Sequence, residues 1–324
     1  MSQTLLKFYI LTLVVPFLSA CTFVPVTPIS ENTPASPDII AKNIQENNFT
    51  ALEKTWQELD IIPKDYFFRD RNKLSFSVQQ FYFEGNQGDE YAMLIIRENE
   101  FEWDWQYLLF RKDEIEWKAL GNIDLAMQKY SVEPSYRVIA SNQQDIWLVV
   151  RSLTGSGTGF SLYEEIWYRL TGEELEEVLR YPVGGTIALP GGFASLELDG
   201  EVGPHWQNGD TYTIAISFEP SYWGHGEKGE YPLFSMKQMA YYNWSPEHNR
   251  FLLNLEESEI TQEQIDREFY YYYEDLLKYS NTYEKLIELA RSGGKKQKEW
   301  LTKLLEDVDD SPEKENLLKI MDTP

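Results

Sequence analysis

The sequence predicts a mainly β protein: an antiparallel, multi-stranded β body with short N-terminal helices and an α-helical C-terminal region. Short apolar stretches with alternating polar residues recur from about residue 74 to residue 255, separated by turn signals. Aromatic residues make up 15% of the chain, which favours half-buried pleated surfaces. Helical periodicity is found on either side of this segment. A sandwich, a barrel or blade-like meanders would fit, and no repeat at a fixed period favours the blades.

Two short helices are expected between residues 38 and 62. Ser36, Pro37 and Asp38 form a helix-start pattern, with an N-cap residue, a proline at the first position and an acid in the first turn. Apolar residues then recur at helical spacing, with a break around Asn47-Asn48. Residues 63–255 are expected to form one antiparallel β domain of about twelve strands, with a glycine-rich break at 183–194.

Residues 256–324 are expected to form a helical region. One apolar stripe is formed by Ile265, Phe269, Tyr272 and Leu276. A second stripe is formed by Trp300, Leu301, Leu304, Leu305 and Val308. Gly293-Gly294 separates two of these helices, and Ser311-Pro312 begins the last one. Helical hairpins packed on one end of the β body are the simplest arrangement.

Residues 1–20 have the layout of a secretory signal peptide. Lys7 supplies the positive charge, an uncharged segment runs from Phe8 to Ala20, and small residues stand at its end. The segment is too short for a transmembrane helix, which needs about 20 apolar residues. We therefore expect the signal peptide to be removed from the mature protein.

The end of this segment, Leu18-Ser19-Ala20-Cys21, closely resembles the lipobox of bacterial lipoprotein precursors. The resemblance implies cleavage before Cys21, a diacylglycerol on its sulfur and acyl chains such as palmitate as a lipid anchor. Thr22 differs from the Asp that resembles an inner-membrane retention signal. The resemblance thus implies the outer membrane of a Gram-negative envelope, or otherwise the outer face of the cell membrane. An ordinary signal peptide with a coincidental cysteine is the alternative.

The lipidated cysteine and a proline-rich tether occupy residues 21–37. Residues 22–37 hold four prolines and no basic residue, and would reach roughly 50 Å if fully extended. Without Lys7, 28 basic residues face 53 acidic ones, which gives the mature chain a net charge of −25. This charge disfavours nucleic acid as a partner and electrostatic adsorption to anionic lipid, and it leaves the acyl chains as the anchor.

The sequence predicts no catalytic residue, metal site or cofactor. TGSGTGF (154–160) lies between two strand-like stretches, so it is interpreted as a hairpin turn rather than a phosphate loop. The three histidines, His205, His225 and His248, lie in separate predicted loops without metal-ligand spacing. Glu164 and Glu165 are adjacent in a predicted strand and should point to opposite faces, which disfavours joint catalysis.

Two aromatic, glycine-rich stretches are the candidate ligand-binding elements. The first, GPHWQNGD, contains His205 and Trp206, and the second, EPSYWGHGEKGEYP, contains Tyr222, Trp223 and His225. Exposed aromatic side chains can stack on sugar faces or anchor a protein partner. The stretches flank TYTIAISF, so they would lie at opposite ends of a straight strand. The alternative is that these aromatic residues belong to the core.

The sequence therefore predicts a membrane-anchored bacterial envelope lipoprotein that acts as a non-catalytic binding or scaffolding module. Its expected partners are the membrane, through the lipid on Cys21, and an envelope protein or glycan. The alternative is a hydrolase acting on envelope carbohydrate, using paired carboxylates and the aromatic loops.

Overall fold

The structure is a computed structural model that describes most of the chain in twelve segments. These are residues 36–59, 75–85, 88–98, 105–114, 116–124, 135–140, 145–157, 159–197, 206–208, 211–270, 277 and 280–322. Strands account for 52% of the described residues, and they pair antiparallel, which confirms the mainly β fold with its C-terminal helical region. In this described part, no helix has the length and apolar character needed to span a membrane. The lipobox and residues 22–35 of the tether lie outside the described residues.

The chain divides into two compact units. Unit 1 comprises Met1–Val132 and Leu170–Glu176, and unit 2 comprises Glu133–Arg169 and Glu177–Pro324. The sequence predicts all strands in one domain, 63–255, whereas the structure distributes them over two sheets, each with its own hydrophobic core. The boundary between the two units falls after the fourth strand.

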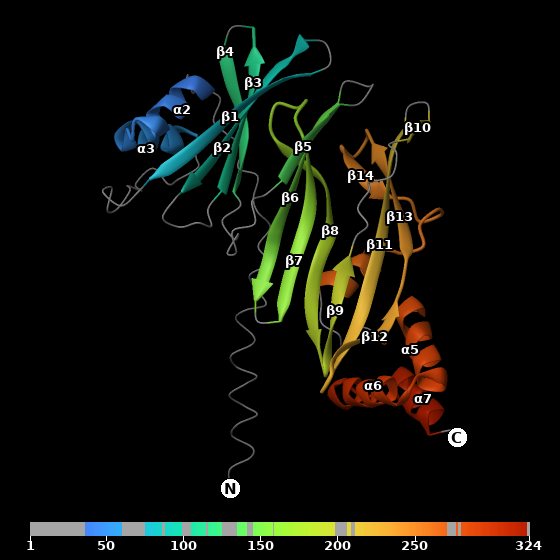
Figure 1. Cartoon of the computed structure of the whole chain (residues 1–324). Helices are drawn as coiled ribbons and strands as arrows, with labels where there is room; N and C mark the ends of the chain where they lie inside the picture. The colour runs from blue at the N-terminus through green and yellow to red at the C-terminus, as the bar shows by residue number, and fades with distance from the viewer. Residues whose placement is uncertain are drawn as a thin grey trace. The chain divides into compact units, whose positions relative to one another are not determined.

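Unit 1 is a four-stranded meander covered on one face by two helices (Figure 1). The elements are α2 (Pro37–Gln45), α3 (Phe49–Glu58), β1 (Phe76–Glu84), β2 (Glu90–Glu98), β3 (Trp105–Asp113) and β4 (Glu116–Asp124). Ser36 caps α2 by accepting a hydrogen bond from the Ile39 N–H, as its sequence predicts. Asn47 adopts a positive φ of 51°, and Asn48 caps α3, so the break between the helices is also confirmed.

The core of unit 1 lies between the helices and the sheet. Its buried members are Ile40, Ala41, Ile44, Leu52, Trp56, Leu59, Ala92, Leu94, Ile96, Leu108 and Phe110. The segment Leu170–Glu176 also belongs to this unit. Its Leu175 N–H donates to the Leu120 carbonyl at 3.0 Å, and the Arg111 guanidinium donates to the Gly172 carbonyl at 2.9 Å. Lys118 and Glu173 form an ion pair beside these contacts.

Unit 2 contains a long antiparallel sheet with the strand order β14-β13-β11-β9-β8-β7-β6-β5, and β10 and β12 pair with β11. The bounds are β5 (Ser135–Ala140), β6 (Ile146–Gly157), β7 (Phe160–Arg169), β8 (Glu176–Leu189), β9 (Gly192–Glu197), β10 (Trp206–Asn208), β11 (Thr211–Gly226), β12 (Gly229–Ser235), β13 (Gln238–Ser245) and β14 (Arg250–Leu253). The TGSGTGF stretch forms the β6–β7 hairpin, because Gly157 pairs with Phe160. The hairpin interpretation is therefore confirmed.

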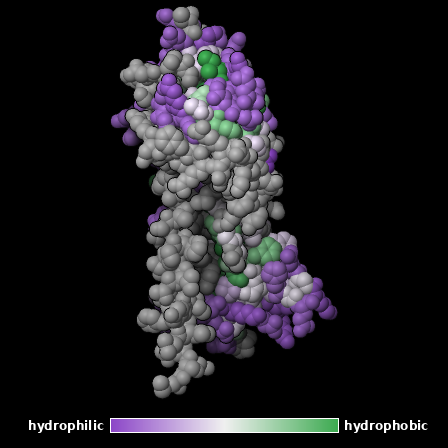
Figure 2. All heavy atoms as spheres, turned by 90° about the vertical axis from the view of Figure 1, so that its left-hand side faces the viewer, coloured by the Kyte–Doolittle hydropathy of each residue, from purple (hydrophilic) through white to green (hydrophobic). Residues whose placement is uncertain are grey.

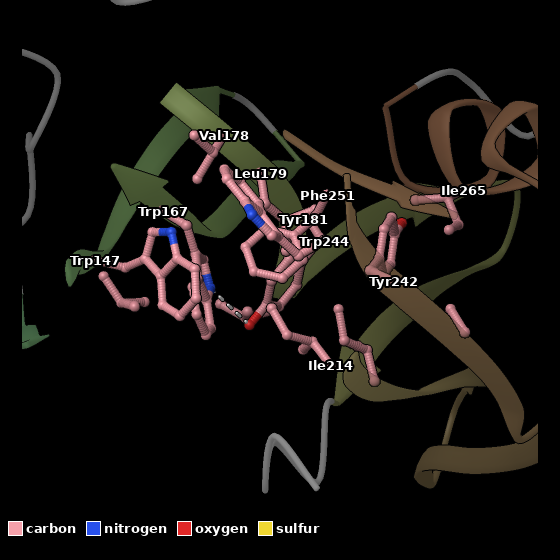
Figure 3. Close-up of a cluster of buried hydrophobic side chains, with 14 of the residues drawn as sticks. Trp147, Trp167, Val178, Leu179, Tyr181, Ile214, Tyr242, Trp244, Phe251 and Ile265 are labelled. Atoms are coloured by element: carbon pink, nitrogen blue, oxygen red, sulfur yellow. Dashed lines mark hydrogen bonds between the residues drawn. The ribbon is translucent and has the colours of Figure 1, made fainter. Parts of the chain in front are cut away.

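An aromatic core shows that this sheet is strongly curled. Trp147 of β6 lies 5.7 Å from Trp244 of β13 and 5.4 Å from Phe251 of β14, between ring centroids. β6 and β13 are five strand steps apart along the sheet, which would be about 24 Å if the sheet were flat. The two halves of the sheet therefore face each other across a filled interior (Figure 3).

The last three C-terminal helices pack on the same inner face, further along the strands (Figure 1). Their bounds are α4 (Gln262–Tyr270), α5 (Ser280–Ser292), α6 (Lys295–Asp307) and α7 (Pro312–Met321). The predicted stripe on α6 is buried, with Trp300, Leu301 and Leu304 at 1% exposure or less. Ile265 of α4 is buried in the aromatic core, whereas Tyr272 and Leu276 of that predicted stripe lie outside the described residues.

The expected glycine-rich break at 183–194 is wrong. β8 continues to Leu189, and β9 begins at Gly192 after a tight turn. A side chain at Gly185 would place its Cβ 2.4 Å from the Ser161 carbonyl oxygen, and one at Gly192 would place it 2.2 Å from that of Trp223. These glycines therefore permit close approach of neighbouring backbones within a sheet, and they do not interrupt it.

Candidate binding face

Strand β11 has one buried face and one partly exposed face in its second half. Tyr222 and Gly224 are buried, whereas Ser221 and Trp223 are partly exposed and His225 is exposed. Because successive side chains of a strand point to opposite faces, Trp223 and His225 lie on the outer face, away from the core and the C-terminal helices.

A row of apolar side chains crosses the outer face at Trp223. Phe193 of β9 lies directly opposite Trp223 on one side, and Pro232 of β12 lies opposite it on the other. The His225 ring packs on Phe193, with 5.2 Å between the ring centroids and 46° between the planes. We call Phe193, Trp223, His225 and Pro232 the outer aromatic face. It is a partly exposed surface held on three hydrogen-bonded strands.

Hydroxyl side chains form the next row on the same face. Ser221 lies opposite Ser235 of β12, two residues before Trp223 on its own strand. Thr186 of β8 is exposed and lies in the same row, two strands from Ser221, with β9 between them. A β-bulge shifts the register between Tyr222 and Trp223, and bulges re-aim side chains near binding sites. Aromatic surface beside hydroxyl donors and acceptors suits a ligand with both apolar and polar faces.

The residues predicted to bind ligand do not form one site. Tyr222 is only 3% exposed and stacks on Phe234, with 4.3 Å between ring centroids, so it belongs to the core. Trp206 begins β10 and lies opposite Thr213, ten residues before Trp223 on β11. Ten residues of strand span about 33 Å, so Trp206 and Trp223 belong to different ends of the strand. His205 lies outside the described residues.

The sequence predicts a loop at 219–232, and this is wrong: the stretch forms the end of β11, a two-residue turn and the start of β12. The outer aromatic face therefore rests on rigid strands. Phe193 was not predicted as a site residue because its segment was interpreted as a glycine-rich break. Its position opposite Trp223 would follow only from knowing the β9–β11 register.

The histidines are separated as well. His248 lies in the turn after β13, where its Nδ1 is 2.9 Å from the Ser245 hydroxyl oxygen. His225 lies near the opposite end of β11, which pairs with β13 through its first half only. Within the described residues, no group of three histidine, cysteine, aspartate or glutamate side chains is arranged to hold a metal ion.

Glu165 is a buried carboxylate on the inner face of β7. Arg137 of β5 donates two hydrogen bonds to it, at 3.0 and 2.8 Å, and the Tyr181 hydroxyl donates a third at 2.5 Å. Burial first, and then the charge of Glu165, raise the pKa of Tyr181 well above its ordinary value. The carboxylate is therefore fully engaged in a structural network beside the aromatic core.

Glu164 has different partners. Arg180 of β8 donates to it at 3.1 Å and holds Glu177 through two further hydrogen bonds, at 2.9 and 2.7 Å. Burial opposes the charge of Arg180, but the hydrogen bonds to Glu177 and the charge of Glu164 outweigh it, and its pKa is raised. Glu164 and Glu165 are thus held by separate arginines, and they do not form the carboxylate pair that glycoside hydrolysis uses.

No protein-family model matches the chain, and no curated protein is significantly similar to it.

Proposed function

We propose that the protein is a lipid-anchored bacterial envelope protein whose body binds a ligand without catalysis. The anchor rests on the sequence, where an uncharged segment ends in Leu18-Ser19-Ala20-Cys21. Burial of acyl chains contributes about 0.8 kcal/mol per CH₂, and two or more chains give stable attachment. Residues 22–35 then connect the lipid to the folded body, which starts at Ser36. Thr22, in place of an aspartate, favours the outer membrane if the envelope has one.

The observation that carries the binding role is the outer aromatic face. Trp223, Phe193 and His225 present ring surface on the side of the sheet away from the core, on strands that cannot rearrange easily. Partly exposed rings on a rigid surface provide contact area at a low entropic cost. The ligand class that suits this face is a neutral saccharide, whose C–H faces stack on rings and whose hydroxyls hydrogen-bond to Ser221, Ser235 and Thr186.

Binding to envelope glycan is tested by co-sedimentation with insoluble cell-wall glycan from the source bacterium. We expect the wild-type protein to pellet with the glycan and Trp223→Ala to lose at least about fivefold in affinity, because stacking on an aromatic ring is worth about 1 kcal/mol or more. Equal sedimentation of the two proteins would show that this face does not bind the glycan.

The anchor is tested by metabolic labelling with a fatty acid. Wild-type protein should incorporate the label and fractionate with membranes, and Cys21→Ser should do neither. Labelling that persists in Cys21→Ser would contradict the proposed lipidation. The two tests are independent, since the glycan assay needs no lipid on Cys21.

A further inference from the structure

The start of helix α6 carries a concentrated positive charge on an acidic protein. Residues 291–303 include five basic residues and one acid, Glu299, and so have a net charge of +4. The rest of the mature chain therefore has a net charge of −29. We call Arg291, Lys295, Lys296, Lys298 and Lys303 the lysine cluster. In the space-filling view, hydrophilic side chains gather over the C-terminal helices (Figure 2).

The lysine cluster is held in place by the β11–β12 hairpin. Tyr231 of β12 donates a hydrogen bond to the Lys296 carbonyl at 3.1 Å, and the Lys296 ammonium lies 5.2 Å from the centroid of the Tyr231 ring. The Gln297 side chain donates to the Pro232 and Leu233 carbonyls, at 3.4 and 3.3 Å. Strand and helix are thus fixed to each other, and the cations have a defined place on unit 2.

Few acids neutralise these cations. Lys295 lies 3.8 Å from Glu299, and its side chain is 90% exposed, so the pair is weak. Among the described residues, Lys296, Lys298 and Lys303 form no ion pair. The nearest acidic run in the sequence, 306–310, begins three residues beyond Lys303 but eight residues beyond Lys298. The three lysines at the start of α6 are therefore about 12 Å or more from that run along the helix axis, beyond a Debye length of about 8 Å in physiological salt.

The charge order on α6 is unfavourable for the helix itself. Lys295, Lys296 and Lys298 occupy its first turn, where the helix dipole favours acids, and Glu306 and Asp307 occupy its last turn, where the dipole favours bases. α2 and α7 follow the usual order, with acids in the first turn and a lysine in the last, whereas α3 has neither. Departures from a local rule are expected where a function requires them. The lysine cluster is therefore placed against local stability.

We propose that the lysine cluster docks against the phosphate headgroups of an anionic bilayer, the one that holds the lipid anchor. This inference rests on the proposed function, because a tether of roughly 50 Å keeps the body close enough for weak contacts to form repeatedly. Clusters of four to eight exposed basic residues are typical of anionic lipid binding. The net negative charge of the whole chain disfavours such binding, but the basic residues of the lysine cluster are separated in the sequence from most of the acidic residues. The acidic remainder is repelled, so docking also orients the body.

The test uses the mature chain from residue 21 with Cys21→Ser, which has no signal peptide and no lipid. Co-sedimentation is measured with vesicles of phosphatidylglycerol and of phosphatidylcholine. We expect binding to phosphatidylglycerol only, lost in about 0.5 M salt, where the Debye length is much shorter. Lys295→Gln/Lys296→Gln/Lys298→Gln should weaken it at least tenfold, since each basic residue near an anionic surface contributes about fivefold.

The matched control is Lys42→Gln/Lys54→Gln/Lys319→Gln, which removes the same charge from helices outside the lysine cluster. Its binding should stay within about twofold of the parent, because Lys42 and Lys54 are paired with Glu46 and Glu58 and none of the three lysines belongs to the lysine cluster. The cluster variant should melt at or above the parent temperature, because it relieves the dipole conflict, so lost binding cannot be attributed to unfolding. Equal binding of cluster variant and parent, or equal binding to both lipids, would overturn the proposal. A negative result with vesicles would refute docking of the lysine cluster and leave the fatty-acid labelling of Cys21 unaffected. A negative labelling result would refute the anchor and leave vesicle binding unaffected.

Discussion

The rings of His225 and Phe193 lie 5.2 Å apart, between centroids, on the outer face of the neighbouring strands β11 and β9. Phe193 also lies directly opposite Trp223, so His225 extends the apolar row to the exposed end of the strand. The contact therefore joins residues separated by about thirty positions in sequence into one surface, which the register of the sheet fixes.

His225→Ala should leave the stability of the protein almost unchanged, because the residue is exposed. A change of about 0.5 kcal/mol or less is expected for such a substitution. Its affinity for cell-wall glycan should fall severalfold, since the ring supplies part of the outer aromatic face. His248→Ala is the matched control, because His248 is also exposed and lies near the other end of β11. Binding that falls equally in both variants would argue against a specific role of this face.

The Glu165–Tyr181 pair should be strongly coupled in stability. Tyr181→Phe removes the 2.5 Å donor to a carboxylate that is 5% exposed, and it should cost about 1 to 3 kcal/mol. Glu165→Ala removes the bidentate acceptor of Arg137, whose side chain is 42% exposed and can be solvated, and it should cost about 1 to 3 kcal/mol. A double-mutant cycle measured by denaturant unfolding should give a coupling of about 1 kcal/mol or more. Additive effects would show that the two side chains do not stabilise each other.

Much of the local structure follows from the sequence because local chemistry specifies it. Ser36-Pro37-Asp38 starts α2, Gly293-Gly294 separates α5 from α6, and Ser311 caps α7, as expected from each pattern. Antiparallel strands follow from alternating polarity, which is visible within a few residues.

The arrangement in space could not be predicted in the same way. Curling of the unit 2 sheet depends on how Trp147 meets Trp244 and Phe251 from distant strands. Gly185 and Gly192 allow neighbouring strands to approach closely, because they have no side chain. Sequence alone does not distinguish such a glycine from one in a turn. Residue type alone identifies Trp223 and His225 as candidates. The burial of Tyr222 depends on which face of strand β11 its side chain occupies, and the sequence predicts a loop there.

The Tyr82–Asp38 hydrogen bond makes stability depend on alkaline pH. The Tyr82 hydroxyl donates to Asp38 at 2.8 Å, and burial, followed by this hydrogen bond, raises the pKa of Tyr82 to about 12. An unfolded tyrosine ionises near pH 10. The folded state therefore binds the phenol proton of Tyr82 more tightly than the unfolded state does. The contribution of this proton to the free energy of unfolding is complete below about pH 10 and is lost as the pH rises towards 12.

Asp38→Asn should lower the pKa of Tyr82 towards 10, measured by NMR of the tyrosine ring in the native protein. Tyr82→Phe should remove the corresponding part of the alkaline loss of stability in denaturant unfolding. Tyr82 is 53% exposed, so this loss is small compared with that from buried tyrosines such as Tyr181. A pKa of Tyr82 that is the same in both proteins would contradict the role assigned to Asp38.

Mass spectrometry of the mature N-terminus tests the lipid anchor most directly. The protein is isolated from membranes of its source organism, and its N-terminal peptide is fragmented. The account predicts that this peptide begins at Cys21 and carries a diacylglycerol on the sulfur. A mature chain that begins at another residue, or a Cys21 thiol without lipid, would contradict it.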